Sequence, residues 1–250
     1  MTPNGHDMHA MILAAGRGER MRPLTDTTPK PLLAVRGKPL IQWHLESLAQ
    51  AGFQQVVINL AHLGDQIKQL IGDGQRWGLK VRYSEEPDGA LETAGGIATA
   101  RPWEAADGRS SSLPFLVINA DIFTDWTVSQ APKIATAMTE SPIDQAQCHL
   151  VLVDNPSHHP DGDFSLSTSL PSEPQRVLAK TEGQSLTFSG IGVYDRHMFD
   201  DIPGGTRMPL APLLHAAIAQ GRCLGSHHTG LWSDVGTPER LANLNQLRER

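Results

Sequence analysis

Cysteine is scarce in this sequence. Its 250 residues include two cysteines, Cys148 and Cys223, and neither falls in the paired spacing of a structural metal site. Two cysteines in a chain of this length do not form the disulfide framework on which small secreted proteins depend. We therefore expect both to be reduced thiols in the core.

Long hydrophobic runs are absent as well. No apolar run reaches the roughly 18 residues that a membrane-spanning helix requires, and the first nine residues lack the basic and then apolar order of a secretion signal. We expect a cytoplasmic protein that does not bind membranes. Residues 1–8 read as a flexible leader ahead of a single domain over residues 9–250.

Positive charge is not in excess. The chain has 21 Lys and Arg against 27 Asp and Glu, which gives a formal net charge of -6. A nucleic-acid-binding surface needs clustered positive charge, so this composition argues against such a partner. Small molecules are the expected partners, and no obligate protein partner is evident.

Short apolar runs alternate with amphipathic segments along the first half. Strands are predicted at 10–14, 32–35, 56–59, 79–84 and 115–119, with helices from Pro39 to before Gly52, at 64–71 and at 94–100. This βα alternation predicts an α/β fold in which βα units feed a parallel sheet. The second half is less regular, with strands at 150–153, 185–194 and 223–227 and helices at 210–220 and from Pro238.

A segment rich in glycine and arginine follows the first predicted strand. Its glycines let the backbone approach a triphosphate closely and turn N–H groups toward phosphate oxygens, while Arg17, Arg20 and Arg22 supply forked donors. Two glycines alone also fit a tight turn, and the third glycine of a dinucleotide-binding loop is missing. The candidate nucleotide-binding residues of this segment are Leu13, Ala14, Ala15, Gly16, Arg17, Gly18 and Glu19, and Arg20 is a candidate catalytic residue.

One lysine and two carboxylates complete the candidate site. Lys30 stands between two prolines, which would present its ammonium from a stiff loop. Asp121 follows a buried strand, at the carboxyl end where open α/β sheets bind ligands, and Asp234 stands at a second corner between strand and loop. Hard oxygen ligands of this kind suit Mg²⁺. Taken singly, Asp121 could start a turn and Asp234 could cap a helix.

The combined motifs L-A-A-G-x-G-x-R-M-x-P-L-T, T-P-K-P-L, V-x-N-x-D and W-x-D-V-G-T resemble those of the nucleotidyltransferases that make nucleoside diphosphate sugars. The resemblance covers nearly the whole chain. It implies the nucleotide-diphospho-sugar transferase fold, an α/β fold with a Rossmann-like, mixed and mainly parallel sheet flanked by helices. Within it, the nucleotide-binding half would be at about 9–125 and the sugar-binding half at about 126–240. It also implies attack of a sugar 1-phosphate on the α-phosphate of a nucleoside triphosphate, with release of pyrophosphate.

Carried over by position, the resemblance implies a role for each matching residue. Arg20, Lys30 and Asp121 would be catalytic, with Arg20 on the triphosphate and Lys30 at the α-phosphate, while Asp121 and Asp234 would hold Mg²⁺. Gly190 would allow close approach of the sugar, although a strand bulge is its other interpretation. Beyond the glycine loop and Lys30, the nucleotide-binding set adds Asn59, Glu92, Thr93 and Gly95, and the sugar-binding set is Asn119, Asp154, Gly190 and Asp234.

Glu92 departs from the broad family, which has glycine at this position in Leu-Gly-Thr-Ala. The segment here, Leu-Glu-Thr-Ala-Gly-Gly from residue 91, is similar to a narrower branch: uridylyltransferases that act on N-acetylmuramate 1-phosphate in peptidoglycan recycling. The resemblance therefore implies that UTP and N-acetyl-α-muramate 1-phosphate give UDP-N-acetylmuramate and pyrophosphate.

Other functions stay open at this point. Within the family, the alternatives are a mannose-1-phosphate guanylyltransferase or a glucose-1-phosphate uridylyl- or thymidylyltransferase. In a different class, the chain could be an inactive nucleotide-sugar-binding regulatory protein. His158 and His159 are adjacent on one loop, a spacing that favours a solvated or substrate-facing loop over a metal site.

Overall fold

The computed structural model describes residues 7–105, 108–140, 146–168, 175–180 and 184–246. Residues 1–6 of the expected leader lie outside this part of the chain. Met8, which the sequence analysis places in the leader, is fully buried in the core. Its apolar side chain packs with that of Ile12, so the packed structure includes residue 8.

The first half of the chain builds a parallel sheet. Its strands are β1 (Ala10–Leu13), β4 (Gln55–Leu60), β5 (Lys80–Glu85) and β6 (Phe115–Asn119), in the spatial order β5-β4-β1-β6. The connecting helices are α1 (Leu40–Gln50), α2 (Gly64–Ile71) and α3 (Glu92–Ala100). The predicted alternation of strands and helices is confirmed here. The strand predicted at 32–35 is shorter, because a 3-10 turn at Lys30–Leu32 precedes β2 (Ala34–Val35).

The second half extends the same sheet with mixed pairing. β11 (Ser185–Tyr194) runs antiparallel to both β6 and β8 (Cys148–Val153), whereas β12 (Cys223–His228) is parallel to β8. β10 (Gln175–Ala179) and β9 (Phe164–Leu166) complete nine strands within the described residues. The mixed α/β fold is confirmed, but the mainly parallel pairing holds for the first half only, because the second half returns through antiparallel neighbours.

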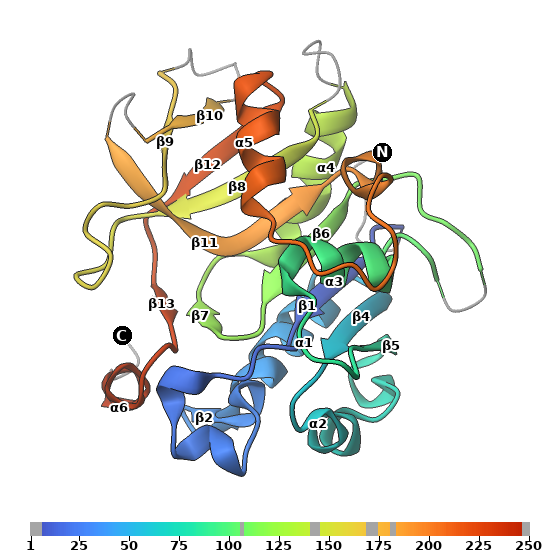
Figure 1. Ribbon diagram of the computed structural model, residues 1–250, viewed down its shortest axis with the longest axis vertical. Coiled ribbons are helices and arrows are strands. Elements are labelled where there is room, and N and C mark those ends of the chain that lie inside the picture. The colour runs from blue at the N-terminus through green and yellow to red at the C-terminus, as the bar shows by residue number, and fades with distance from the viewer. Residues whose placement is uncertain (1–6, 106–107, 141–145, 169–174, 181–183, 247–250) are drawn as a thin grey trace.

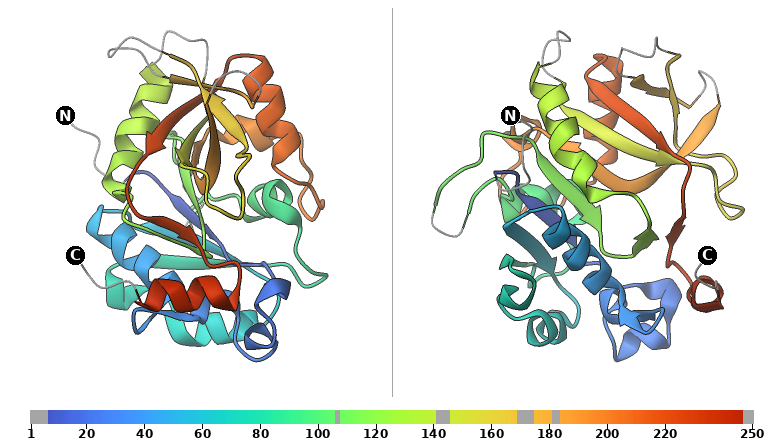
Figure 2. Two further views of the ribbon diagram at one scale, coloured as in Figure 1. Left: turned by 90° about the vertical axis from the view of Figure 1, so that its left-hand side faces the viewer. Right: turned by 180° about the vertical axis from the view of Figure 1, so that it is seen from behind.

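Helices cover both faces of this sheet. Successive residues of a strand point to opposite faces, so Ile12 packs into a cluster with α1, α2 and α4 (Ala131–Glu140), while Met11 packs with α3 and α5 (Ala211–Ala219). In Figure 1 α3 and α5 lie in front of the sheet, and α1 and α4 come to the front when the molecule is seen from behind in Figure 2. The result is a three-layer arrangement.

A smaller cluster joins the two ends of the described chain. It packs Met21, Val35, Val235 and Leu244 together. Its elements are the hairpin of β2 and β3 (Lys38–Pro39), the antiparallel pair β7 (Ile122–Thr124) and β13 (Trp232–Asp234), and α6 (Pro238–Gln246). Figure 1 shows α6 beside the β2 region. The remaining 3-10 helices are Glu19–Met21, Leu24–Asp26, Gln75–Trp77, Val128–Gln130 and Arg196–Phe199.

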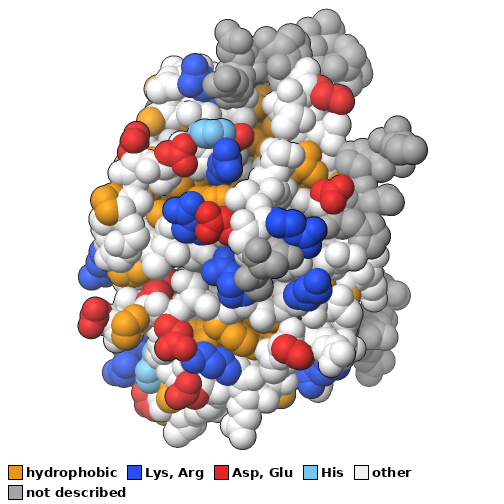
Figure 3. Space-filling model, turned by 90° about the vertical axis from the view of Figure 1, so that its right-hand side faces the viewer, with side chains coloured by type: hydrophobic (Ala, Val, Ile, Leu, Met, Phe, Trp, Pro, Cys, Tyr) orange, Lys and Arg blue, Asp and Glu red, His pale blue; other side chains and the backbone are white. Residues whose placement is uncertain are grey.

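The surface and the thiols agree with the composition. Cys148 and Cys223 are both free and buried. None of the helices in the described ranges combines the length and apolarity that a bilayer crossing would need. On the face drawn in Figure 3, acidic and basic side chains are interspersed rather than gathered into one basic surface.

Burial of histidine predicts acid sensitivity. Burial lowers the pKa of His149 on β8 from 6.5 to about 4, and its Nε2 lies 3.0 Å from Ser226 Oγ. The unfolded chain therefore binds more protons than the folded chain between pH 6.5 and 4, and the free energy of unfolding falls as the pH drops through that window. From pH 7 to pH 5, His149 should account for about 2 kcal/mol of that loss.

The measurement is urea unfolding of the wild type and of His149→Gln at both pH values. Glutamine does not titrate but can still hydrogen-bond to Ser226, so the variant should lose less stability over the interval. An equal loss in both proteins would contradict the assignment.

Candidate active site

A pocket of about 400 Å³ opens at the carboxyl ends of β1, β4 and β6. This is the edge of the sheet where α/β folds place ligands. Most residues of the predicted site line it, although they come from five separate stretches of sequence. They are Leu13, Ala14, Ala15, Gly16, Gly18, Glu19, Arg20, Lys30, Asn59, Glu92, Thr93, Asn119 and Asp121.

The glycine loop forms one wall of the pocket. Gly18 has a φ of 69°, and a Cβ at this position would lie 3.1 Å from Thr25 Cγ2 and 3.4 Å from Lys30 Cβ, so glycine lets the loop fold against the lysine. Arg20 is exposed and forms no ion pair within the described residues. Its guanidinium is therefore available to an anion. Arg17 instead pairs with Glu19 at 2.8 Å and faces a neighbouring hollow of about 660 Å³.

A buried carboxylate, Glu86, connects other parts of the pocket lining through hydrogen bonds. The Ala14 N–H donates to Asn59 Oδ1 at 2.8 Å, and Asn59 Nδ2 donates to Glu86 Oε1 at 2.8 Å. The Leu91 N–H donates to Glu86 Oε2 at 2.7 Å, and the glutamate is 2% exposed. The sequence analysis missed Glu86. An acidic residue directly after the β5 strand was the available signal, because neighbouring strands end in site residues.

Substitution of Glu86 by glutamine should weaken this part of the pocket lining. Both carboxylate oxygens of Glu86 accept a hydrogen bond. The amide NH₂ of a glutamine would replace one of these acceptors with a donor, which would then face either Asn59 Nδ2 or the Leu91 N–H, also donors. Leaving such a pair unsatisfied costs about 1–3 kcal/mol, and KM for the nucleotide should rise. Denaturant unfolding and nucleotide titration measure the two effects.

The matched control for that change is the neighbouring Glu85→Gln. Glu85 is exposed and pairs with Lys68, and an exposed ion pair contributes at most about 1 kcal/mol. Equal effects of the two substitutions would refute a special role for Glu86.

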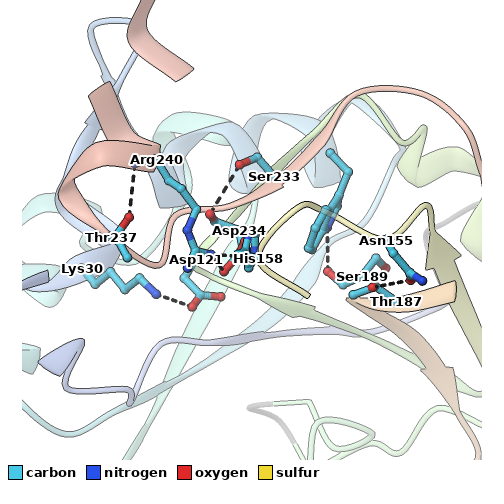
Figure 4. A network of polar contacts seen from close by, with 11 residues as sticks. Lys30, Asp121, Asn155, His158, Thr187, Ser189, Ser233, Asp234, Thr237 and Arg240 are labelled. Carbon is cyan, nitrogen blue, oxygen red and sulfur yellow. Dashed lines mark hydrogen bonds and ion pairs between the residues drawn. The ribbon is translucent and has the colours of Figure 1, made fainter. Parts of the chain in front are cut away.

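Lys30 and Asp121 both line the pocket and are in direct contact. Lys30 lies between Pro29 and Pro31 and is the first residue of the short 3-10 helix Lys30–Leu32. Only 8% of the lysine is exposed. Its Nζ donates to Asp121 Oδ2 at 2.5 Å, while the Asp121 side chain is 37% exposed. A desolvated ammonium is thus held against a carboxylate that still faces the pocket (Figure 4).

Asp234 lies beside Asp121, although it does not line the pocket itself. Ile122, the next residue after Asp121, pairs with Asp234 across β7 and β13, and the Val235 N–H donates to the Asp121 carbonyl at 2.8 Å. Arg240 Nη1 contacts Asp234 Oδ2, and His158 Nε2 lies 3.0 Å from Asp234 Oδ1. Figure 4 shows this cluster next to Lys30 and Asp121.

The two carboxylates fit the donor set that Mg²⁺ uses. Among the described residues no group of three or more His, Cys, Asp or Glu side chains is arranged to hold a metal, so a protein-only cage of the zinc or calcium kind is not present there. Two neighbouring carboxylates, with water and phosphate oxygens supplying the other ligands, are typical of Mg²⁺. Each of the two carboxylates is paired with a cation, Asp121 with Lys30 and Asp234 with Arg240.

Besides Arg17 and Asp234, three predicted site residues are not part of the pocket lining. A Cβ on Gly95 would lie 2.0 Å from the Thr206 carbonyl oxygen, so Gly95 allows α3 to pack against that loop. Asp154 is exposed at the end of β8 and accepts from His227 at 2.9 Å. Gly190 has a φ of 81°, sits in a bulge of β11, and would place a Cβ 2.7 Å from Asn119 Nδ2. Gly190 therefore shapes the wall behind Asn119.

Glu92 has a backbone conformation that explains the family glycine. Its φ is 62°, in the left-handed region that glycine adopts most easily. In this chain Arg207 Nη2 lies 3.0 Å from Glu92 Oε1. Arg207 belongs to the loop that also packs on Gly95. The departure from glycine thus keeps the backbone turn and adds an exposed ion pair at the mouth of the pocket.

The fold and pocket together define a nucleotide-binding transferase of the α/β class. The sequence model described as "Nucleotidyl transferase" matches residues 9–250. The chain therefore belongs to the nucleotidyl transferase family.

The chain is similar along nearly its whole length to individual nucleotidyltransferases. The chain is 52% identical over 240 residues to the N-acetylmuramate alpha-1-phosphate uridylyltransferase of Neisseria meningitidis serogroup B, covering 96% of this chain and 98% of that protein. It is 32% identical to the protein of the same name from Caulobacter vibrioides, covering 96% and 97%. A crystal structure of a provisionally assigned glucose-1-phosphate thymidylyltransferase from Bacillus anthracis, with sucrose, has a TM-score of 0.75 at 21% identity, covering 95% and 94%. The last likeness concerns the fold alone.

Proposed function

We propose that this protein catalyses the reaction of UTP with N-acetyl-α-muramate 1-phosphate to give UDP-N-acetylmuramate and pyrophosphate, a step of peptidoglycan recycling. The observation that carries the proposal is the 52% identity, over almost the full length of both chains, to an enzyme named for this activity. A second relative of that name is matched over nearly its full length too. The pocket supplies the groups that such a reaction requires.

Charge orients the nucleotide in the pocket. Gly16, Gly18, Arg20 and Lys30 line the pocket with backbone N–H groups and two cations suited to a triphosphate. Glu86 and Glu92 line it too, and their carboxylates would repel phosphates. We assign the triphosphate to the first group of residues and the base to Asn59, Glu92 and Thr93.

The chemistry needs charge neutralisation and alignment more than a base. The phosphate of the sugar 1-phosphate is already ionised at neutral pH, so one of its oxygens can attack the α-phosphorus as the bond to the pyrophosphate oxygen breaks. Lys30 would stabilise the charge that builds on the α-phosphate, and Arg20 would hold the triphosphate. When bound by Asp121 and Asp234, Mg²⁺ supplies further neutralisation of phosphate charge.

We assign the sugar to the side of the pocket where Asn119 meets the second half of the chain. Asn119 lines the pocket at the end of β6, with Gly190 directly behind it. Asp234 lies next to Asp121 on the same side. We propose a nucleotide half at about 9–125 and a sugar half at about 126–240, with Asn119 as a sugar contact that the nucleotide half contributes.

The test is pyrophosphate release from a matrix of substrates in the presence of Mg²⁺. The nucleotides are UTP, dTTP, GTP, CTP and ATP, and the sugars are the 1-phosphates of N-acetylmuramate, N-acetylglucosamine, glucose and mannose. The expected result is dominant release from UTP with N-acetylmuramate 1-phosphate. Release with hexose 1-phosphates alone would keep the reaction class and reject the sugar, and silence in every combination would reject the enzyme.

A further inference from the structure

Arg240 on α6 is a charged residue beside the pocket for which the reaction at phosphorus provides no role. Its side chain is 18% exposed. A Cβ on Gly236, which lines the pocket, would lie 2.8 Å from Arg240 Nη1 and 2.8 Å from Asp234 Oδ2. The guanidinium therefore lies beside this lining residue, on the side that we assign to the sugar.

The contacts of Arg240 use one edge of its guanidinium. Nη1 contacts Asp234 Oδ2 and lies 2.9 Å from His158 Nε2. Within the described residues, Nε and Nη2 form no hydrogen bond or ion pair. A guanidinium has five N–H donors in a fixed fork, so this side chain is anchored through one nitrogen and keeps the geometry that binds a carboxylate with two parallel hydrogen bonds.

The groups around Arg240 are held in place from both sides. The Arg240 N–H donates to Thr237 Oγ1 at 3.3 Å in the first turn of α6. His158 comes from the loop after β8, and hydrogen bonds of Asn155 hold this loop in place. Asn155 Nδ2 donates to the carbonyls of Pro160 and Ser185. Asn155 Oδ1 accepts from Thr187 Oγ1 at 2.9 Å. Figure 4 shows Asn155 and Thr187 on one side of His158 and Thr237 on the other. The cluster is thus built into the fold.

The substrate of the proposed function carries a second anion besides its phosphate. N-acetylmuramate differs from N-acetylglucosamine by a lactyl ether that ends in a carboxylate. A carboxylate that enters a partly buried site needs a cationic partner to compensate for lost hydration. An arginine with a free fork provides the charge and the two-point geometry, whereas hexose 1-phosphates offer it no such group.

We propose that Arg240, positioned by Asp234 and His158, binds the lactyl carboxylate of the sugar and selects N-acetylmuramate over sugars that lack it. This inference rests on the proposed function. It makes Arg240 a specificity-determining residue, which is a different role from holding Asp234 or binding the sugar phosphate. Those two roles would affect every sugar 1-phosphate equally.

The test compares three sugar 1-phosphates with UTP: N-acetylmuramate 1-phosphate, the same compound with its lactyl carboxylate converted to a carboxamide, and N-acetylglucosamine 1-phosphate. With the wild type, kcat/KM should be roughly 10- to 100-fold higher for the carboxylate than for either other sugar, the range expected for hydrogen bonds to a charged group. With Arg240→Gln this ratio should fall close to one. The exposed Arg196→Gln is the matched control and should keep the wild-type ratio.

Equal losses on all three sugars in Arg240→Gln would overturn the inference and leave Arg240 as a support for Asp234. A wild type that turns over hexose 1-phosphates but not N-acetylmuramate 1-phosphate would instead reject the proposed function. If Arg240→Gln is inactive with every sugar, calorimetry on UDP-N-acetylmuramate and UDP-N-acetylglucosamine gives the ratio of their dissociation constants. That ratio should also be closer to one in the variant than in the wild type. If it does not fold, Arg240→Lys, which keeps the charge without the fork, should lose part of the preference, and an unchanged preference would refute the proposal.

Discussion

Replacement of Asp121 by asparagine should lower kcat by on the order of 10³-fold or more while the fold stays intact. Asp121 combines two roles in one side chain: it is the counter-ion of Lys30 at 2.5 Å and the more exposed of the two carboxylates proposed for Mg²⁺. Asparagine has nearly the same shape, but it carries no charge and is a far weaker magnesium ligand. The expected loss is therefore chemical rather than steric.

Steady-state pyrophosphate release over a Mg²⁺ titration measures this effect. The variant should need more Mg²⁺ and still not recover the wild-type rate at saturation. Thermal unfolding and far-UV circular dichroism check the fold, and Asp201→Asn, at an exposed site away from the pocket, is the control for loss of a carboxylate. Turnover close to that of the wild type at ordinary Mg²⁺ concentrations would refute the metal role of Asp121.

The parts of the site that could be predicted from sequence are those where one short segment carries the chemistry. The glycine loop follows β1 directly, and Lys30 follows it within a rigid stretch between two prolines, so their placement depends on local geometry. Asp121 was found because a strongly apolar run ends just before it, and parallel strands place their carboxyl ends at one edge.

The contacts missed from sequence join segments far apart in the chain. Arg240 and His158 are separated by 82 residues and meet because α6 packs beside the loop after β8. The sequence analysis predicts a solvated or substrate-facing loop at His158, but no sequence pattern links this residue to Arg240. Glu86 shows the same limit, since its partners Asn59 and Leu91 come from different elements. Tertiary contact, not local sequence, selects these residues.

Helix α4 was missed for a different reason. Its buried face consists mainly of small side chains, Ala131 and Ala135, with Met138 as the larger member. Alanine contributes little to a hydrophobic periodicity, and Pro132 at the start reads as a break unless the first turn of a helix is already assumed. The packing against β8 and β11 supplies what the pattern lacks.

Replacement of Lys30 by alanine should lower kcat by roughly 10²- to 10³-fold, the range seen when one preorganised donor to a developing charge is removed. Lys30 is buried, whereas Asp121 remains 37% exposed, so solvent can hydrate the carboxylate that loses its partner and the fold should survive. Because the charge on the α-phosphate grows toward the transition state, kcat should fall more than KM for UTP rises.

Steady-state kinetics at several UTP concentrations separate kcat from KM. Lys80→Ala, at the exposed first residue of β5, is the control for loss of a surface lysine. A change confined to KM would mean that Lys30 binds the ground-state triphosphate and does not act at the reacting phosphorus. The comparison with Asp121→Asn then tests the pair itself. If the short contact between the two side chains is needed for catalysis, the double variant should lose much less activity than the product of the two single losses, since either change alone already breaks the contact.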